Sequence, residues 1–70
     1  MKKLLLDEYL KGLLESKPDW NVTINVHGRE VIRCAIAKLN FDMIAGNLLY
    51  APVGLVTYDY PTKRYTYYVD

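Results

Sequence analysis

The fold of this chain is decided by residues 20–27, which read WNVTINVH. Apolar residues occupy every second position of this stretch: Trp20, Val22, Ile24 and Val26. Because successive side chains of a β-strand point to opposite faces, the alternation predicts a strand with one buried and one solvent-exposed face. Gly28 follows at once, so we expect the chain to reverse there into a second strand at 30–39.

The register of this hairpin has two alternatives. A two-residue turn at Gly28 and Arg29 would place Arg33 opposite Ile24, on the buried face. A loop one residue longer gives three pairs on that face: Val26 with Ile32, Ile24 with Cys34, and Val22 with Ile36. The longer loop keeps Arg33 on the exposed face, and we favour it because a one-residue slip would turn every side chain over. A rival interpretation of 29–45 as one helix is disfavoured, because its polar residues do not gather on one helical face.

Helical segments are expected on both sides of this hairpin. Apolar residues recur three or four positions apart within 3–16: Leu6, Tyr9, Leu10, Leu13 and Leu14. This spacing predicts an amphipathic helix, and Pro18 ends it because a proline disfavours helical geometry in the residue before it. Residues 41–50 are expected to form a short helix or helical turn capped by Asn40.

Two further strands are expected at 54–60 and 64–69, joined by a turn at 60–63 with Pro61 at its second position. The chain is therefore interpreted as one domain spanning 1–70, of the α+β class. We expect a four-stranded antiparallel sheet made of two hairpins, with an N-terminal helix and a short second helix packed on one face. The core is expected between the first helix and the first hairpin: Leu10, Leu13, Trp20, Val22, Ile24, Ile32, Cys34 and Ile36.

Composition excludes several classes of protein. The 70 residues carry 9 Lys and Arg against 8 Asp and Glu, and this net charge of +1 lacks the basic excess typical of phosphate-binding domains. No apolar run approaches the roughly 18 residues of a membrane span. Asp7 and Glu8 interrupt a signal-like start, and Cys34 is the single cysteine. Both observations indicate a cytoplasmic protein in a reducing compartment.

The sequence offers no catalytic, cofactor-binding or metal-binding residues. Its one histidine, His27, and its one cysteine, Cys34, are expected on opposite faces of the hairpin, where they cannot form a nucleophile and base pair. One His and one Cys cannot make a four-ligand zinc site, and the four glycines are scattered singly instead of forming a phosphate loop. We therefore do not expect an enzyme.

Tyrosine is the unusual feature of the composition. Seven residues are Tyr, and five lie near the C-terminal end: Tyr58, Tyr60, Tyr65, Tyr67 and Tyr68. Alternation would send Tyr65 and Tyr67 to one face and the other three to the opposite face, so some rings should be exposed. Exposed Tyr is typical of recognition surfaces. The C-terminal hairpin is predicted to present the partner surface, and its strand 64–69 is expected at an open sheet edge. The predicted partner-binding residues are Tyr60, Lys63, Arg64, Tyr65 and Tyr67.

These observations favour a small non-enzymatic protein-binding module that occupies the surface of a partner protein. Its size matches that of phage or mobile-element inhibitors of host defence complexes, which is an analogy of scale only. The alternative is a small single-stranded nucleic-acid-binding or transcription-regulatory protein, because tyrosines interleaved with cations also suit base stacking. A third hypothesis is a subunit that completes its core as a homodimer.

Overall fold

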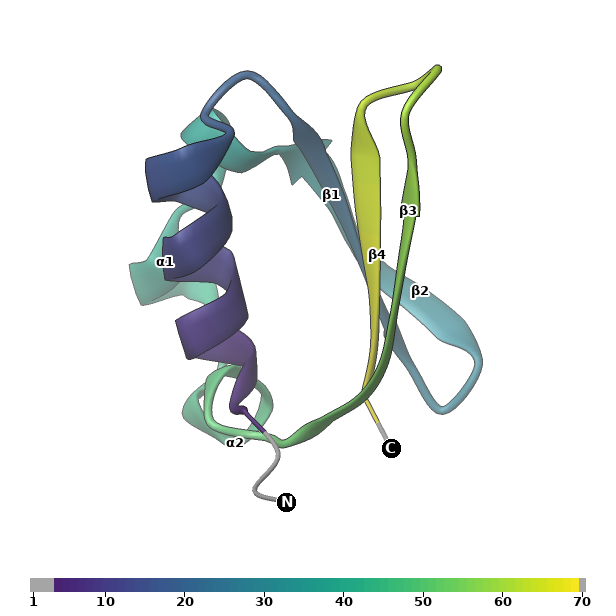
Figure 1. The fold of residues 1–70 in the computed structure, drawn as a ribbon. Coiled ribbons are helices and arrows are strands. Elements are labelled where there is room, and N and C mark those ends of the chain that lie inside the picture. The colour runs from purple at the N-terminus through teal and green to yellow at the C-terminus, as the bar shows by residue number, and fades with distance from the viewer. Residues whose placement is uncertain (1–3, 70) are drawn as a thin grey trace.

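A computed structural model describes residues 4–69 as one sheet with helices on one of its faces (Figure 1). In chain order the elements are α1 (Leu6–Ser16), β1 (Asn21–Val26), β2 (Arg29–Ala35), the 3-10 helices η1 (Ile36–Lys38) and η2 (Phe41–Met43), α2 (Gly46–Leu49), β3 (Val53–Asp59) and β4 (Arg64–Val69). The expected α+β class, with two hairpins, an N-terminal helix and a short second helix, is confirmed.

The strands are ordered β2-β1-β4-β3, and the sheet is mixed, so the expectation of an antiparallel sheet is wrong for its middle pair. Its two outer pairs are the antiparallel hairpins β1–β2 and β3–β4, whereas the middle pair of β1 and β4 is parallel. The expectation that 64–69 lies at a sheet edge is wrong, because β4 is central and the edges are β2 and β3. β1 and β4 both carry buried residues on their inner face, so packing beneath α1 places them side by side.

The first hairpin differs from the favoured register by two residues. His27 and Gly28 have φ values of 51° and 80°, and this left-handed pair makes a two-residue turn that places Val26 across from Arg29. The register then shifts by one residue beside Ile24, which leaves Val31 as a bulge. The inner face consequently pairs Ile24 with Ile32 and Val22 with Cys34, and Arg33 lies across from Thr23 on the outer face. The expected faces of these side chains are therefore correct, although their partners are not.

Helix α1 begins at Leu6, later than expected, while Lys3 lies outside the described residues. Leu4 and Leu5 instead run along the start of β3: the Leu6 N–H donates to the Ala51 carbonyl at 2.9 Å, and the Val53 N–H donates to the Leu4 carbonyl at 3.2 Å. These bonds fix the entry of α1 against the second half of the chain.

The connection between the hairpins contains only short helical segments. β2 ends at Ala35, earlier than the expected 39. The Ile36 N–H still donates to the Trp20 carbonyl at 2.9 Å, but the chain then turns into η1, where the Leu39 N–H donates to the Ile36 carbonyl at 3.2 Å. The expected cap is confirmed, since the Asn40 side chain accepts a hydrogen bond from the Asp42 N–H at 3.0 Å. Gly46–Leu49 forms the short α2, so the expected helix 41–50 is divided in two.

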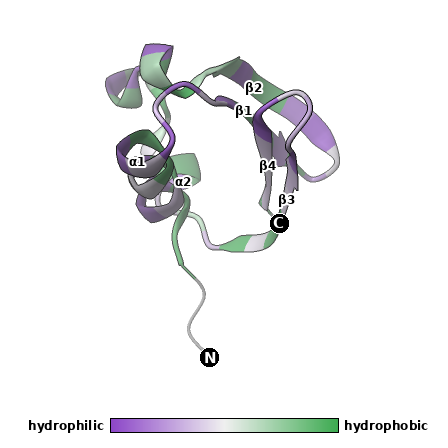
Figure 2. Cartoon of the chain, turned by 45° about the horizontal axis from the view of Figure 1, so that its top comes forward, coloured by the Kyte–Doolittle hydropathy of each residue, from purple (hydrophilic) through white to green (hydrophobic). Residues whose placement is uncertain are grey.

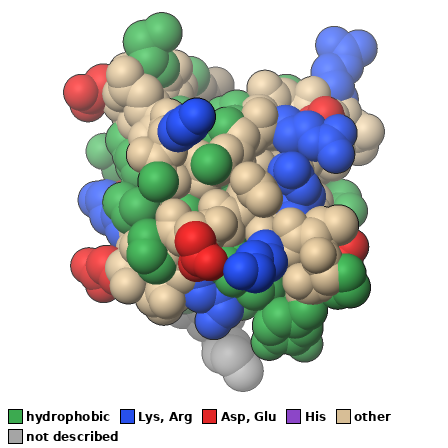
Figure 3. All heavy atoms as spheres, turned by 90° about the horizontal axis from the view of Figure 1, so that it is seen from above, with side chains coloured by type: hydrophobic (Ala, Val, Ile, Leu, Met, Phe, Trp, Pro, Cys, Tyr) green, Lys and Arg blue, Asp and Glu red, His purple; other side chains and the backbone are tan. Residues whose placement is uncertain are grey.

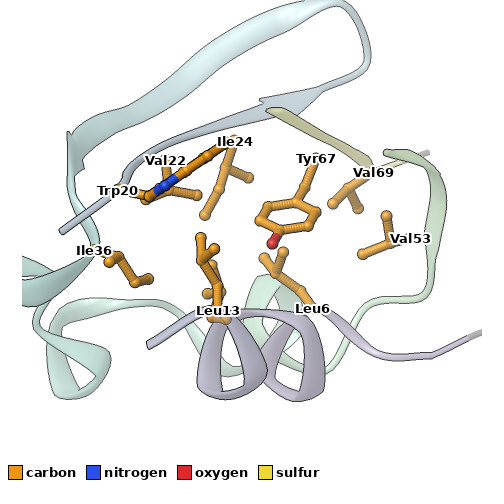
Figure 4. Close-up of a cluster of buried hydrophobic side chains, with 10 residues drawn as sticks. Leu6, Leu13, Trp20, Val22, Ile24, Ile36, Val53, Tyr67 and Val69 are labelled. Carbon is orange, nitrogen blue, oxygen red and sulfur yellow. The ribbon is translucent and has the colours of Figure 1, made fainter. Parts of the chain in front are cut away.

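The core lies between α1 and the sheet. Figure 2 shows the helices on one side of the sheet, and Figure 4 shows the buried side chains that fill the space between them. Its buried residues are Leu6, Leu10, Leu13, Trp20, Val22, Ile24, Ile36, Val53, Tyr67 and Val69. Ile32 and Cys34, which were expected in the core, are only partly buried, because they lie on the edge strand β2. Tyr67, Val53 and Val69, which were not expected in the core, are buried there.

Candidate protein-binding site

A continuous group of six aromatic rings lies on the inner, helix-facing side of β3 and β4. We call it the aromatic cluster: Tyr9, Trp20, Tyr58, Tyr60, Tyr65 and Tyr67. Tyr58 lies directly across from Tyr65, so the two share a face. The expectation that Tyr58 and Tyr60 lie opposite to Tyr65 and Tyr67 is therefore wrong, because the turn at 60–63 restarts the alternation.

The rings contact one another in a chain that leads from the core to the surface. Tyr65 and Tyr67 are stacked, with centroids 6.1 Å apart and planes at 6°. Tyr60 meets Trp20 edge-on, with centroids 5.4 Å apart and planes at 87°. Tyr58 and Tyr60 are also edge-on, at 5.1 Å and 74°. Such offset and T-shaped contacts are favoured by the ring quadrupole, so each ring holds its neighbour in place.

Exposure changes sharply along this chain of rings. Tyr67 is 3% exposed, whereas Tyr58 is 59% and Tyr60 is 62% exposed. The expectation that Tyr67 is an exposed anchor is wrong, because β4 is central and α1 covers its inner face (Figure 4). Burial raises the pKa of the Tyr67 phenol well above its ordinary value, and the neighbouring phenols of Tyr65 and Tyr9 raise this pKa further.

A groove of about 260 Å³ opens between α1 and the second hairpin, and the exposed Tyr58 contacts one of its lining residues, Tyr65. Its lining combines apolar surface with hydroxyl groups: Tyr9, Leu13, Ser16, Val56, Tyr65 and Tyr67. None of these residues carries a charge at neutral pH. The groove therefore suits an apolar or aromatic side chain with a polar tip, which it can hold by contact area and by hydroxyl hydrogen bonds.

The two predicted cationic contacts lie apart from the groove. The Lys63 Nζ lies 3.4 Å from the Asp19 Oδ2 in an exposed ion pair. The Arg64 Nη1 donates to the Thr23 Oγ1 at 2.8 Å, on the outer face of the sheet. The structure thus brings together the predicted Tyr60, Tyr65 and Tyr67, but it places Arg64 on the other side.

Sequence reasoning missed Tyr9, Trp20 and Tyr58 as members of the cluster. Tyr9 and Trp20 were assigned to a helix face and to the core, and nothing local to them points to a distant strand. Tyr58 could have been found, because a turn at 60–63 makes residues equally distant from it, such as Tyr58 and Tyr65, cross-strand neighbours.

The outer face of the sheet has a different character. Among residues 4–69, no helix lies over it, and its central row consists of Arg33, Thr23, Thr66 and Thr57. Figure 3, a view from above, shows Lys and Arg side chains spread over the molecule with Asp and Glu side chains among them. Arg33 is within 3.7 Å of the Glu30 carboxylate, and Arg64 is held by Thr23, so part of this positive charge is already engaged.

The remaining chemically reactive side chains do not gather. Cys34 is a partly buried free thiol, and His27 is exposed in the β1–β2 turn. Within the described residues, no three His, Cys, Asp or Glu side chains lie close enough together to hold a metal ion. In the same part of the chain, no helix combines the length and the apolar character needed to cross a membrane.

Comparison of the chain with protein-family models, with curated proteins and with solved structures found no match.

Proposed function

We propose that this chain is a non-enzymatic protein-binding module that acts by occupying the surface of a partner, with Tyr58 and Tyr60 as its anchors. One observation carries the proposal: two tyrosine rings that are 59% and 62% exposed stand on a base of buried rings. Large aromatic side chains that are exposed beside a groove are typical of the residues that dominate binding energy at protein interfaces.

The contacts of the two rings support this role. Tyr60 is held by Trp20 and Tyr58, and Tyr58 also contacts Tyr65 with centroids 5.8 Å apart. Rings that are already positioned lose less side-chain entropy when a partner covers them. Tyrosine adds a hydroxyl that can form a hydrogen bond at the rim of such an interface.

The class of partner follows from scale and compartment. A chain of this size has the dimensions of the small inhibitors that phages and mobile elements direct at host defence complexes, and we propose a partner of that kind by analogy. The free thiol of Cys34 favours action in the reducing cytoplasm.

The test compares matched tyrosine substitutions. Wild type, Tyr58→Ala, Tyr60→Ala and Tyr50→Ala are used as baits in host lysate, and the partner is then purified so that its Kd can be measured for each bait. Tyr50 is the control, because it is 60% exposed but follows α2, and it is no member of the aromatic cluster. Loss of an anchor should weaken binding about thirtyfold, whereas Tyr50→Ala should leave the Kd unchanged.

Two results would contradict the proposal. A partner that binds Tyr58→Ala and Tyr60→Ala as tightly as wild type would place the interface elsewhere. Equal losses for all three variants would indicate a general effect of tyrosine removal. Thermal unfolding of each variant completes the comparison, because exposed rings should contribute little to the Tm.

A second candidate function rests on the outer face of the sheet, where Arg33, Arg64 and Tyr68 are free of helical cover and could contact a single-stranded nucleic acid. The test is fluorescence anisotropy of a labelled oligonucleotide at rising salt. Binding through phosphates should weaken steeply with salt and should weaken further in Arg33→Ala. No binding at about 50 mM salt would exclude this function.

A further inference from the structure

The two edges of the sheet carry opposite chemistry. β2 carries Arg29, Glu30 and Arg33 and is bulged at Val31, and charges and bulges are the usual protection of an edge strand. β3 has no charged residue or proline from Val53 to Tyr58. An uncharged edge of this kind is a template for another strand.

The hydrogen bonds of β4 identify the free backbone groups of β3. The Asn21 N–H donates to the Lys63 carbonyl, and the His27 N–H donates to the Val69 carbonyl. In a parallel pair, every second residue of a strand directs its backbone N–H and C=O groups toward the neighbouring strand. The odd-numbered residues of β4 therefore direct these groups toward β1, and Arg64, Thr66 and Tyr68 direct theirs toward β3.

The partners of Arg64, Thr66 and Tyr68 in β3 are Asp59, Thr57 and Leu55. The intervening residues Val56 and Tyr58 therefore direct their N–H and C=O groups outward, where residues 4–69 provide no further strand. The Leu4 carbonyl accepts from the Val53 N–H, so the free edge begins after Val53.

We propose that β3 is a homodimer interface, at which β3 of a second copy of this chain adds antiparallel to form one continuous sheet. A two-fold axis at Thr57 places Val56 across from Tyr58 of the second copy, and Tyr58 across from its Val56. This register lets both outward residues of each copy exchange both of their backbone hydrogen bonds.

The side chains and charges of β3 fit a second copy of itself. In this register Val56 meets a tyrosine ring on the inner face, and aromatic with β-branched residues are favourable cross-strand pairs. Asp59 lies across from Leu55 of the second copy, so the one charged residue of β3 does not face its own copy. Leu55 and Tyr58, which are 57% and 59% exposed, would both become covered. The inference rests on the backbone of β3 and not on the proposed function, but the dimer covers the proposed anchor Tyr58, so the dimer and the partner complex are alternative uses of this ring.

Sedimentation equilibrium of the whole chain from about 1 µM to about 1 mM tests the interface. Wild type should change from 8.1 kDa towards twice that mass as concentration rises. Thr57→Lys, on the exposed outer face, places two lysines across from each other and should weaken association at least about tenfold. Val31→Lys is the matched control at the other edge and should associate like wild type.

A mixture of Thr57→Lys and Thr57→Glu tests the register, because opposite charges at the same position should restore the dimer. Circular dichroism melts show that each variant is folded. Wild type that remains at 8.1 kDa over the whole range would overturn the proposal. Association of Thr57→Lys equal to that of wild type, or a mixture that stays monomeric, would overturn the β3 interface centred on Thr57.

Discussion

The two hairpins of the sheet use the same pairing but distribute their residues differently. The β1–β2 hairpin turns through two left-handed residues and carries its charges on its outer strand. The β3–β4 hairpin turns through Tyr60–Lys63, and its outer strand carries the ring of Tyr58 and a single charged residue, Asp59. The helices cover the inner residues of β1 completely, since Val22 and Ile24 are 0% exposed, while most of β3 stays open.

This difference teaches that the central strand of each hairpin, and not the hairpin as a unit, supplies most of the buried side chains of the sheet. Each hairpin contributes one central strand to the core, namely β1 or β4. The outer strands are then free to differ, and one carries charges while the other carries tyrosine. The predictions below test this division between central and outer strands.

The largest effect is expected for Ile24→Ala in the central strand β1. Ile24 is 0% exposed, so its truncation should lower the free energy of unfolding by about 2–4 kcal/mol. Leu55→Ala in the outer strand β3 removes a side chain that is 57% exposed and should cost less than about 0.5 kcal/mol. Urea unfolding measures both, and similar losses would contradict the division.

Smaller effects are expected at the two turns, where substitution of one residue should destabilise the fold and substitution of the other should stabilise it. Gly28 has a φ of 80° with open space where a Cβ would be added, so Gly28→Ala should cost about 1 kcal/mol through backbone strain alone. Lys63 has a φ of 52°, and Lys63→Gly should relieve the strain and stabilise the fold by up to about 1 kcal/mol. A loss at both turns would show that the Lys63 side chain matters more than its backbone conformation.

The smallest effect at neutral pH is expected for Tyr67→Phe, which keeps the buried ring. This substitution should change how the free energy of unfolding depends on pH under alkaline conditions. The folded pKa of the phenol lies above its ordinary value of 10.0, so its contribution is fully present below about pH 10 and is lost as the pH rises through the folded pKa. Tyr67→Phe should therefore reduce the loss of stability above pH 10. Tyr58→Phe is the outer-strand control and should retain the loss.

Local pattern was enough to predict the elements but not their arrangement. The stripe of α1 and the alternation of 20–27 depend on neighbouring residues, and both elements form. Burial departs from the expected pattern at Leu14, which is 38% exposed, and at Thr23, which is 5% exposed on the outer face. The parallel pairing of Asn21 with Arg64 joins distant parts of the chain, so no local signal specifies it. A usable signal existed in the alternation of Tyr65, Tyr67 and Val69, which matches the buried pattern of β1 and marks a second central strand.

The candidate site was predicted in its residue type but not in its geometry. Tyr60 and Tyr65 were expected on opposite faces, but Trp20 and Tyr58 connect them in one cluster. The burial of Tyr67 depends on the strand order. The outer position of Arg64 follows from its parity in β4, which becomes known only when Tyr65 is placed on the inner face. Assignment of faces across a turn needs the turn geometry first.

The parallel pairing of β1 with β4 also determines the order in which the domain can assemble. Each hairpin can close early, because its strands are joined by short turns. The sheet is complete only when residues 21–26 meet residues 64–69, which requires closing the whole intervening segment against its chain entropy. Until then β1 lacks its parallel neighbour, and the core lacks the buried side chains of Tyr67 and Val69. We therefore expect the four-stranded sheet to form only after residues 64–69 have been synthesised.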